Sequence, residues 1–165
     1  YCVSALDYAQ SLGCGRVALV CNRNSEMARH ADVAIEVDTG PEVIMGSTRM
    51  KAGTAQKMVM NMLSTAVMVR MGRTCDNLMI MIKARNVKAN YRMLRLFAQA
   101  VGNPDLDYAR KMMDEADGDL SVAVLMALHG VSREEAAQAL SDGQGYFDRA
   151  MRLLENQKTG ACTTA

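Results

Sequence analysis

The sequence predicts an α/β fold, in which part of a parallel sheet flanked by helices is followed by a small all-α subdomain. Two short apolar runs near the N-terminus alternate with helical patterns, which is typical of parallel strands with helical connections. A long helical pattern fills the middle of the chain, and only short amphipathic patterns follow Pro104. Half of the 165 residues are hydrophobic, so the chain can bury a core.

The N-terminal elements follow from the periodicity of the apolar residues. Residues 3–12 carry apolar side chains at helical spacing. Residues 17–21 form a continuous apolar run, as in a strand that is buried on both faces. Ser25 is a candidate N-cap for a short helix over residues 26–30, and residues 33–37 form a second run of strand length.

Two strands are too few to make a stable sheet. We therefore expect the neighbouring strands to come from another chain or from a part of the protein outside this sequence. The chain begins with Tyr1 rather than Met, and we expect it to be a fragment or a processed product.

A long helix is expected over residues 50–71. It is apolar on most sides, which predicts that it is buried, for example at a subunit interface. A polar stripe shares one face of this helix, because its members follow at helical spacings: Thr54, Lys57, Asn61 and Ser64. The stripe is either the solvated edge of a buried helix or the lining of a site.

The elements that follow are predicted with one ambiguity. Residues 77–82, NLMIMI, are apolar throughout, and periodicity does not decide between strand and helix. Residues 86–101 have the apolar face of a helix, which ends at Gly102-Asn-Pro104. Ser132 and Glu135 have the spacing of a capping box. Four short helices form the predicted helical subdomain, over residues 106–116, 120–128, 133–140 and 146–154.

The composition excludes several functions. The net charge of +1 and the 4% of aromatic residues provide neither a basic field nor a stacking platform, so we expect no nucleic-acid partner. No apolar run has transmembrane length, so we expect no membrane partner. Five cysteines without a CxxC spacing favour a reducing cytoplasm over a disulfide framework or a zinc site. His30 and His129 lie in no catalytic motif and are interpreted as surface or helix-end residues.

The segment GPEVIMGSTRMKAGTAQK, residues 40–57, opens the long helix. Ser47 or Thr48 is a candidate cap for the first turn. Arg49 and Lys51 place positive charge at a helix N-terminus, where it opposes the helix dipole. Either an anion lies there, held by free amides, hydroxyls and cations, or both side chains turn into water or toward acidic partners.

Gly46 would let the backbone approach such an anion closely. The whole segment resembles the signature of N-acetylmuramic acid 6-phosphate etherases, and the related glucokinase regulatory protein carries a similar signature. The resemblance includes the VALVCN strand and the GVSREEAAQAL run. It also includes Asn61-Met-Leu-Ser-Thr65, Asn77-Leu-Met79, Ala84, Asn86 and Lys88.

The resemblance implies a sugar isomerase (SIS) fold that binds a phosphorylated amino sugar as a cytoplasmic homodimer. Residues 1–102 would be the C-terminal portion of the SIS domain, and residues 103–158 a helical domain resembling ubiquitin-associated (UBA) domains. Residues 159–165 would be a flexible tail. The family requires no metal, and we expect no cofactor.

The reaction of the family removes D-lactate from N-acetylmuramic acid 6-phosphate and leaves N-acetylglucosamine 6-phosphate. One carboxylate takes the proton at C2, an acid protonates the ether oxygen at C3, and water then adds to the unsaturated intermediate. The catalytic glutamates of the family lie in the N-terminal half of the SIS domain. The resemblance therefore implies that this chain holds no catalytic residue and is inactive alone. A non-catalytic, phosphosugar-binding regulatory protein is the alternative.

Glu42 is the one carboxylate inside the signature. It would contact a sugar hydroxyl or the acetamido group, or else cap backbone amides or pair with a cation. Asp76 stands where the family generally has Gly, and Met81 where it generally has Asp. The candidate substrate-binding residues are Glu42, Gly46, Ser47, Thr48, Arg49, Lys51, Lys57 and Asn61.

Overall fold

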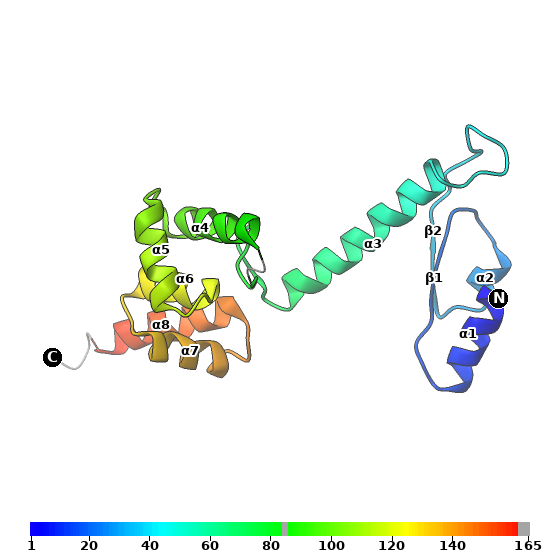
Figure 1. The fold of residues 1–165 in the computed structure, drawn as a ribbon. Coiled ribbons are helices and arrows are strands. Elements are labelled where there is room, and N and C mark those ends of the chain that lie inside the picture. Colours follow the sequence, from blue (N-terminus) through cyan, green and yellow to red (C-terminus); the bar gives the residue numbers. More distant parts are fainter. Residues whose placement is uncertain (84–85, 162–165) are drawn as a thin grey trace. The chain divides into compact units, whose positions relative to one another are not determined.

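The computed structural model describes residues 1–83 and 86–161, which form two compact units (Figure 1). The first unit is Tyr1–Thr65, and the second begins at Ala66. The chain is an α/β protein with mostly helices and a small parallel sheet, as predicted at this level. Ala84, one of the positions of the family resemblance, and residues 162–165 of the predicted tail lie outside the described residues.

The first unit begins with the predicted alternation of helices and strands. Helix α1 covers Cys2–Ser11, β1 covers Val17–Val20, α2 covers Glu26–Arg29 and β2 covers Val33–Glu36. The strands pair in parallel with Val17 opposite Val33, so the predicted strands and their direction are confirmed. Ser25 caps α2, because its hydroxyl accepts a hydrogen bond of 3.1 Å from the amide of Ala28.

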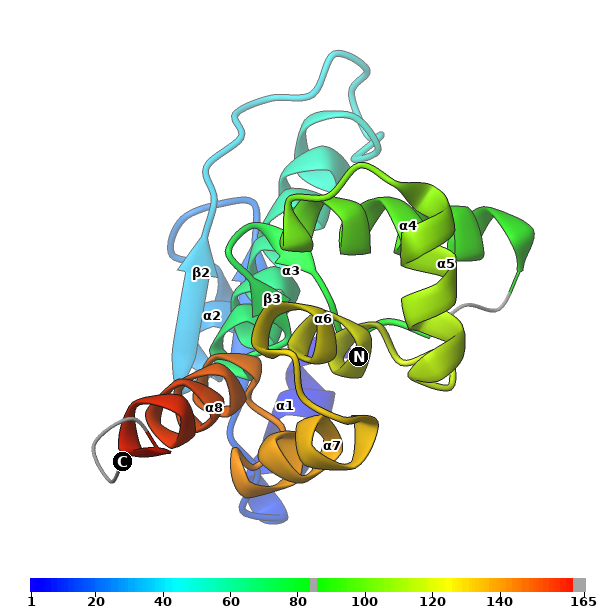
Figure 2. The same cartoon turned by 90° about the vertical axis from the view of Figure 1, so that its left-hand side faces the viewer.

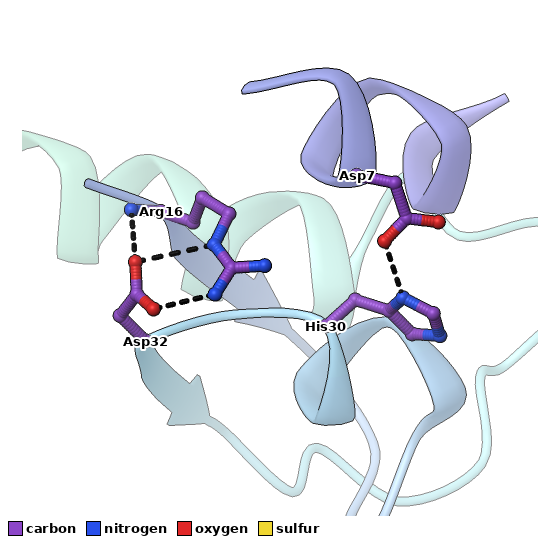
Figure 3. A network of polar contacts seen from close by, with 4 residues as sticks. All are labelled: Asp7, Arg16, His30 and Asp32. Carbon is purple, nitrogen blue, oxygen red and sulfur yellow. Dashed lines mark hydrogen bonds and ion pairs between the residues drawn. The ribbon is translucent and has the colours of Figure 1, made fainter. Parts of the chain in front are cut away.

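Two polar contacts hold this unit together (Figure 3). The Asp32 carboxylate accepts hydrogen bonds from the backbone amide, Nε and Nη2 of Arg16, at 2.8, 3.2 and 2.6 Å. These bonds lower the pKa of Asp32, because they favour its charged form. His30 Nδ1 lies 2.6 Å from Asp7 Oδ1 and ties α2 to α1. The first contact joins the residues that precede β1 and β2, and the second joins the two helices.

Helix α3 covers Lys51–Arg70, close to the predicted range. Within this chain the helix is not buried, because Ala52 is its one buried residue, and burial at a subunit interface stays a prediction. Met58 is 59% exposed, Met60 63% and Met62 59%. An apolar sequence buries a helix only where another element covers it, and the described residues do not cover these side chains. The apolar pattern therefore identifies a surface that lacks a partner here.

The ambiguous apolar run after α3 forms a short antiparallel ladder instead of a helix. Strand β3 is Thr74–Cys75 and pairs with β4, Leu78–Met79. Asp76, in the turn between them, has φ 51°. Asp tolerates this left-handed conformation better than most residues do, although Gly adopts it without strain. Asp76 therefore adopts the kind of backbone conformation that Gly, the usual residue of the family at this position, adopts most easily.

The second unit continues with five helices. The left-handed Gly102 ends α4, as predicted, and the side chain of Asn86 caps its start. The capping box of Ser132 and Glu135 at the start of α7 is also confirmed. The bounds are α4 Val87–Val101, α5 Leu106–Glu115, α6 Leu120–His129, α7 Arg133–Asp142 and α8 Phe147–Ala161. Helix α8 thus extends past residue 158, where the predicted helical domain ends.

These helices enclose one hydrophobic core. Helix α6 contributes more buried residues to it than any other helix does, and it packs against α4, α5, α7 and α8 (Figures 1 and 2). Phe97 of α4 is fully buried in the same core as Leu120 of α6 and Phe147 of α8. The two compact units divide at residues 65 and 66, so α4 packs with the C-terminal helices. The predicted domain boundary at residues 102 and 103 stays a prediction.

Gly72 should be sensitive to substitution. It has φ +67°, and a Cβ there would lie 2.7 Å from Cδ1 and 2.9 Å from Cα of Tyr146. Its carbonyl also accepts a hydrogen bond of 3.2 Å from the amide of Phe147. We expect Gly72→Ala to lower the free energy of unfolding, measured in urea, by about 2–5 kcal/mol, from backbone strain and overpacking together.

The matched control is Gly118→Ala. Gly118 has φ +74°, but a Cβ there would meet nothing within 4 Å. It therefore measures the conformational strain alone, about 1 kcal/mol. Equal losses in the two variants would show that the contact with Tyr146 does not constrain Gly72.

His129 should make the second unit sensitive to pH. Its side chain is buried, with Nε2 3.2 Å from the Sδ of Met151. Burial, and then the charge of Lys158, lower the pKa of His129 below its ordinary value of about 6.5. The unfolded chain therefore binds a proton at a higher pH than the folded chain does, so stability falls as the pH drops below about 6.5.

Urea unfolding of the chain at a series of pH values between about 5 and 8 measures this slope. The fall in stability below about pH 6.5 should be smaller in His129→Gln, whose side chain does not titrate. The same slope in His129→Gln would assign the pH dependence to other groups.

Candidate functional site

The signature segment forms an exposed loop that leads into α3. The loop turns where the amide of Ser47 donates a hydrogen bond of 3.1 Å to the carbonyl of Ile44. Gly46 lies in this turn with φ +86°, a conformation that disfavours any side chain. Thr48 and Arg49 are exposed, and Ser47 is half-buried. Of the predicted residues 46–49, Gly46 and Ser47 thus lie in this turn, and Thr48 and Arg49 follow it in the chain.

Glu42 caps α3. Its Oε2 accepts a hydrogen bond of 3.1 Å from the amide of Lys51, and its Oε1 accepts one of 3.0 Å from the amide of Ala52. A carboxylate at this point is favoured by the helix dipole as well as by the two donors. The expectation that the side chain of Ser47 or Thr48 caps this turn is wrong, since Glu42 takes that position.

The next two amides of α3 also have partners. The amide of Gly53 donates to the carbonyl of Thr48 at 2.9 Å, and the amide of Thr54 donates to the carbonyl of Met50 at 3.1 Å. The first amides of α3, from Lys51 to Thr54, are thus all paired within the protein. The hypothesis that free amides hold an anion there is not supported by this geometry.

Lys51 is also engaged within the loop. Its Nζ donates a hydrogen bond of 2.8 Å to the carbonyl of Pro41, the neighbour of Glu42. The Lys51 side chain thus has a partner within the protein and is not left free to hold an anion. Together the Glu42 carboxylate and the Lys51 ammonium tie the start of the loop to its end. We call this pair of contacts the loop clamp.

The pKa of Glu42 is lowered, chiefly by the bonds from the amides of Ala52 and Lys51. Both bonds favour the charged carboxylate. The sign of the linkage follows, because the unfolded chain binds this proton more tightly than the folded chain does. The stabilisation is present at neutral pH and is lost as the pH falls through the lowered pKa. The cap is therefore charged under ordinary conditions.

Arg49 and Lys57 are the free cations of the site. Both are exposed, and neither forms an ion pair with any described residue. Arg49 lies two residues after Ser47, where the turn that contains Gly46 ends. Lys57 and Asn61 lie further along α3, on one face because they are four residues apart. Asn61 lies about 15 Å along the axis from Lys51, at the helical rise of about 1.5 Å per residue.

The polar stripe of α3 is exposed along its length, and no contact in it points to a ligand. The Ser64 hydroxyl donates to the carbonyl of Asn61 at 3.1 Å, as serines in helices do. The structure thus brings Glu42 and Lys51 into one cluster beside residues 46–49, and it leaves Lys57 and Asn61 outside that cluster. Substrate binding by any of these residues stays a prediction.

Sequence reasoning held backbone capping by Glu42 only as the alternative to a sugar contact, and it placed the cap of the long helix at Ser47 or Thr48. Capping patterns place the carboxylate three residues inside the helix, whereas Glu42 comes nine residues before Lys51. The available signal was indirect. A helix start that carries two cations and lacks an acidic first turn needs a negative partner from elsewhere, and Glu42 was the nearest carboxylate in sequence.

A hollow with a volume of about 770 Å³ lies in the C-terminal unit. Both acidic and basic side chains line it. Two of its arginines form ion pairs: Arg133 with Asp117 at 3.3 Å, and Arg110 with Asp107 at 2.6 Å. No predicted site residue lines it. Nothing in its lining selects one class of ligand.

The described residues also bear on metal binding and on membrane insertion. Among them, no group of three or more His, Cys, Asp or Glu side chains could hold a metal ion. Of the helices in residues 1–83 and 86–161, none combines the length and hydropathy that a membrane span requires.

Comparison with known proteins identifies relatives. No family model matches the chain. The chain is 44% identical to the N-acetylmuramic acid 6-phosphate etherase of Pectobacterium atrosepticum, over 92% of this chain and 50% of the relative. It is 43% identical to that of Clostridioides difficile, over 94% and 51%. It is 46% identical to that of Streptomyces coelicolor, over 92% and 48%.

These matches confirm the resemblance that the signature indicates. The chain is related to the N-acetylmuramic acid 6-phosphate etherases and matches their C-terminal half. It spans about half the length of the curated relatives it matches.

Proposed function

We propose that this chain, a relative of the N-acetylmuramic acid 6-phosphate etherases, is the C-terminal part of such a lyase. The complete protein would cleave the D-lactyl ether of N-acetylmuramic acid 6-phosphate, giving N-acetylglucosamine 6-phosphate and D-lactate. The observation that carries the proposal is the identity of 42–46% over at least 92% of the chain to proteins with this name. The role would be recycling of amino sugars from peptidoglycan in the cytoplasm.

Within that enzyme, we propose that residues 46–49 bind the phosphosugar. Arg49 would pair with the phosphate, because its guanidinium is exposed and has no acidic partner among the described residues. The hydroxyls of Ser47 and Thr48 would donate to it, and Gly46 would let the backbone come close. Lys57 and Asn61 stay candidates for contacts further along α3.

The acid–base chemistry requires carboxylates that this chain does not offer at the signature. Proton transfer at C2 and at the C3 oxygen needs two acid–base groups with different pKa values. Glu42 is the one carboxylate of the segment, and it is occupied by two backbone amides. We therefore propose that the catalytic glutamates belong to the remaining part of the enzyme and that this chain alone is inactive.

We also propose the architecture that the resemblance implies. The β1–α2–β2 unit would belong to an SIS-type sheet, and the C-terminal helices would form a UBA-like domain. The exposed methionines of α3 form an apolar surface of a kind that usually marks an interface. In the complete protein we expect this surface to be covered, with a homodimer as the assembly.

The direct test of the function is an assay of D-lactate release from N-acetylmuramic acid 6-phosphate. We expect release by the complete protein and none by the 165-residue chain. Phosphosugar binding without release by the complete protein would favour the regulatory alternative. Turnover by the chain alone would contradict the proposal that its site is incomplete.

Arg49→Ala tests the proposed phosphate contact in the complete protein. A hydrogen bond to a charged group contributes about 1.5–3 kcal/mol, so phosphosugar affinity should fall by about 10- to 150-fold, measured by calorimetry. The control is Arg152→Ala, which removes an exposed arginine of α8. Equal affinity in Arg49→Ala and the wild type would show that Arg49 faces solvent only.

A further inference from the structure

We propose that Glu42 is a positioning residue, which acts through the loop clamp and does not itself touch the substrate. With Lys51 it would hold residues 46–49 in the shape that receives the phosphosugar. This inference rests on the proposed function and deepens it. It separates the residues of the signature into those that contact the ligand and those that hold the loop.

The loop is closed by contacts between its two ends. Glu42 bonds to amides nine and ten residues further on, and Lys51 reaches back to the carbonyl of Pro41. The two side chains thus cross the same gap in opposite directions. Within the segment between them, the amide of Ser47 donates a backbone hydrogen bond to the carbonyl of Ile44. The clamp joins the two ends of this loop to each other.

The apolar side chains of the loop are exposed. Val43 is 69% exposed, Ile44 66% and Met45 99%. Side chains this exposed add little packing to hold a backbone in one shape. An ordered loop must therefore gain its order from its hydrogen bonds, and the strongest are the charged bonds at its base.

Both oxygens of Glu42 already accept a helical amide. A rotation of the carboxylate away from the helix and toward the sugar would break the bonds from Lys51 and Ala52. That movement would leave two helical amides without their partner, at the end of a helix where a negative charge is favourable. A sugar hydroxyl would give the carboxylate one hydrogen bond in place of the two from these amides. The carboxylate therefore stays on the helix when substrate binds.

The clamp itself is tested by hydrogen exchange of the 165-residue chain, without substrate. In Glu42→Gln the new NH2 group accepts no hydrogen bond, so one of the two amides loses its partner. We expect the Lys51 and Ala52 amides to exchange about 2- to 30-fold faster, the range for loss of a helix cap.

The matched control is Glu36→Gln. The Glu36 carboxylate also accepts a backbone amide, that of Asn24, at 2.8 Å. This control should leave the exchange at Lys51 and Ala52 unchanged. Unchanged exchange at these two amides in Glu42→Gln as well would overturn the clamp.

The positioning role is tested by the kinetics of the complete protein. Both Glu42→Gln and Lys51→Met should raise KM while changing kcat little, because the loop binds substrate and transition state alike. The double variant should be no worse than the worse single variant, since either change opens the same clamp. A lower kcat in Glu42→Gln with normal kinetics in Lys51→Met would show that Glu42 touches the reacting sugar.

The proposed lyase function and the positioning role of Glu42 are contradicted by different results. If the complete wild-type protein releases no D-lactate, the proposed function is wrong, and hydrogen exchange still decides whether the clamp exists. If D-lactate is released but the single effects multiply in the double variant, the function stands and the positioning role is overturned.

Discussion

A helix that starts with backbone amides pointing into solvent needs acceptors for them, and in α3 the Glu42 carboxylate accepts from the first two. The other features of the signature are arranged around this interaction. It brings the beginning of the loop to the start of the helix, and the Lys51 bond to Pro41 closes the loop on the other side. Gly46 then allows the tight turn between these anchors. Arg49 is left exposed, with no internal partner among the described residues.

The same interaction resolves the charges of the segment. Two cations next to a helix N-terminus are unfavourable unless a negative group lies nearby. The chain supplies that group itself, so the cations alone are no argument for a bound anion. Two observations still favour a ligand. The Arg49 guanidinium near the Gly46 turn forms no ion pair with any described residue, and the chain is related to phosphosugar etherases. The proposal for substrate binding therefore depends on Arg49 more than on the helix terminus.

The elements with local signals were predictable from the sequence. Ser25, Asn86 and the Ser132–Glu135 pair begin helices because their caps act within three residues. Non-local features were not predictable. The nine-residue reach of Glu42 has no fixed spacing, and the short β3–β4 ladder depends on pairing that periodicity does not reveal. The burial of α3 depends on a covering surface, which its own sequence does not specify.

The central claim is that Glu42 holds the loop while Arg49 holds the ligand. The most direct measurement is a crystal structure of the complete protein with N-acetylglucosamine 6-phosphate bound. The account predicts the Glu42 carboxylate on the amides of Lys51 and Ala52, with the Arg49 guanidinium on the phosphate. A Glu42 carboxylate turned onto the sugar, with those two amides bound to the phosphate instead, would contradict it.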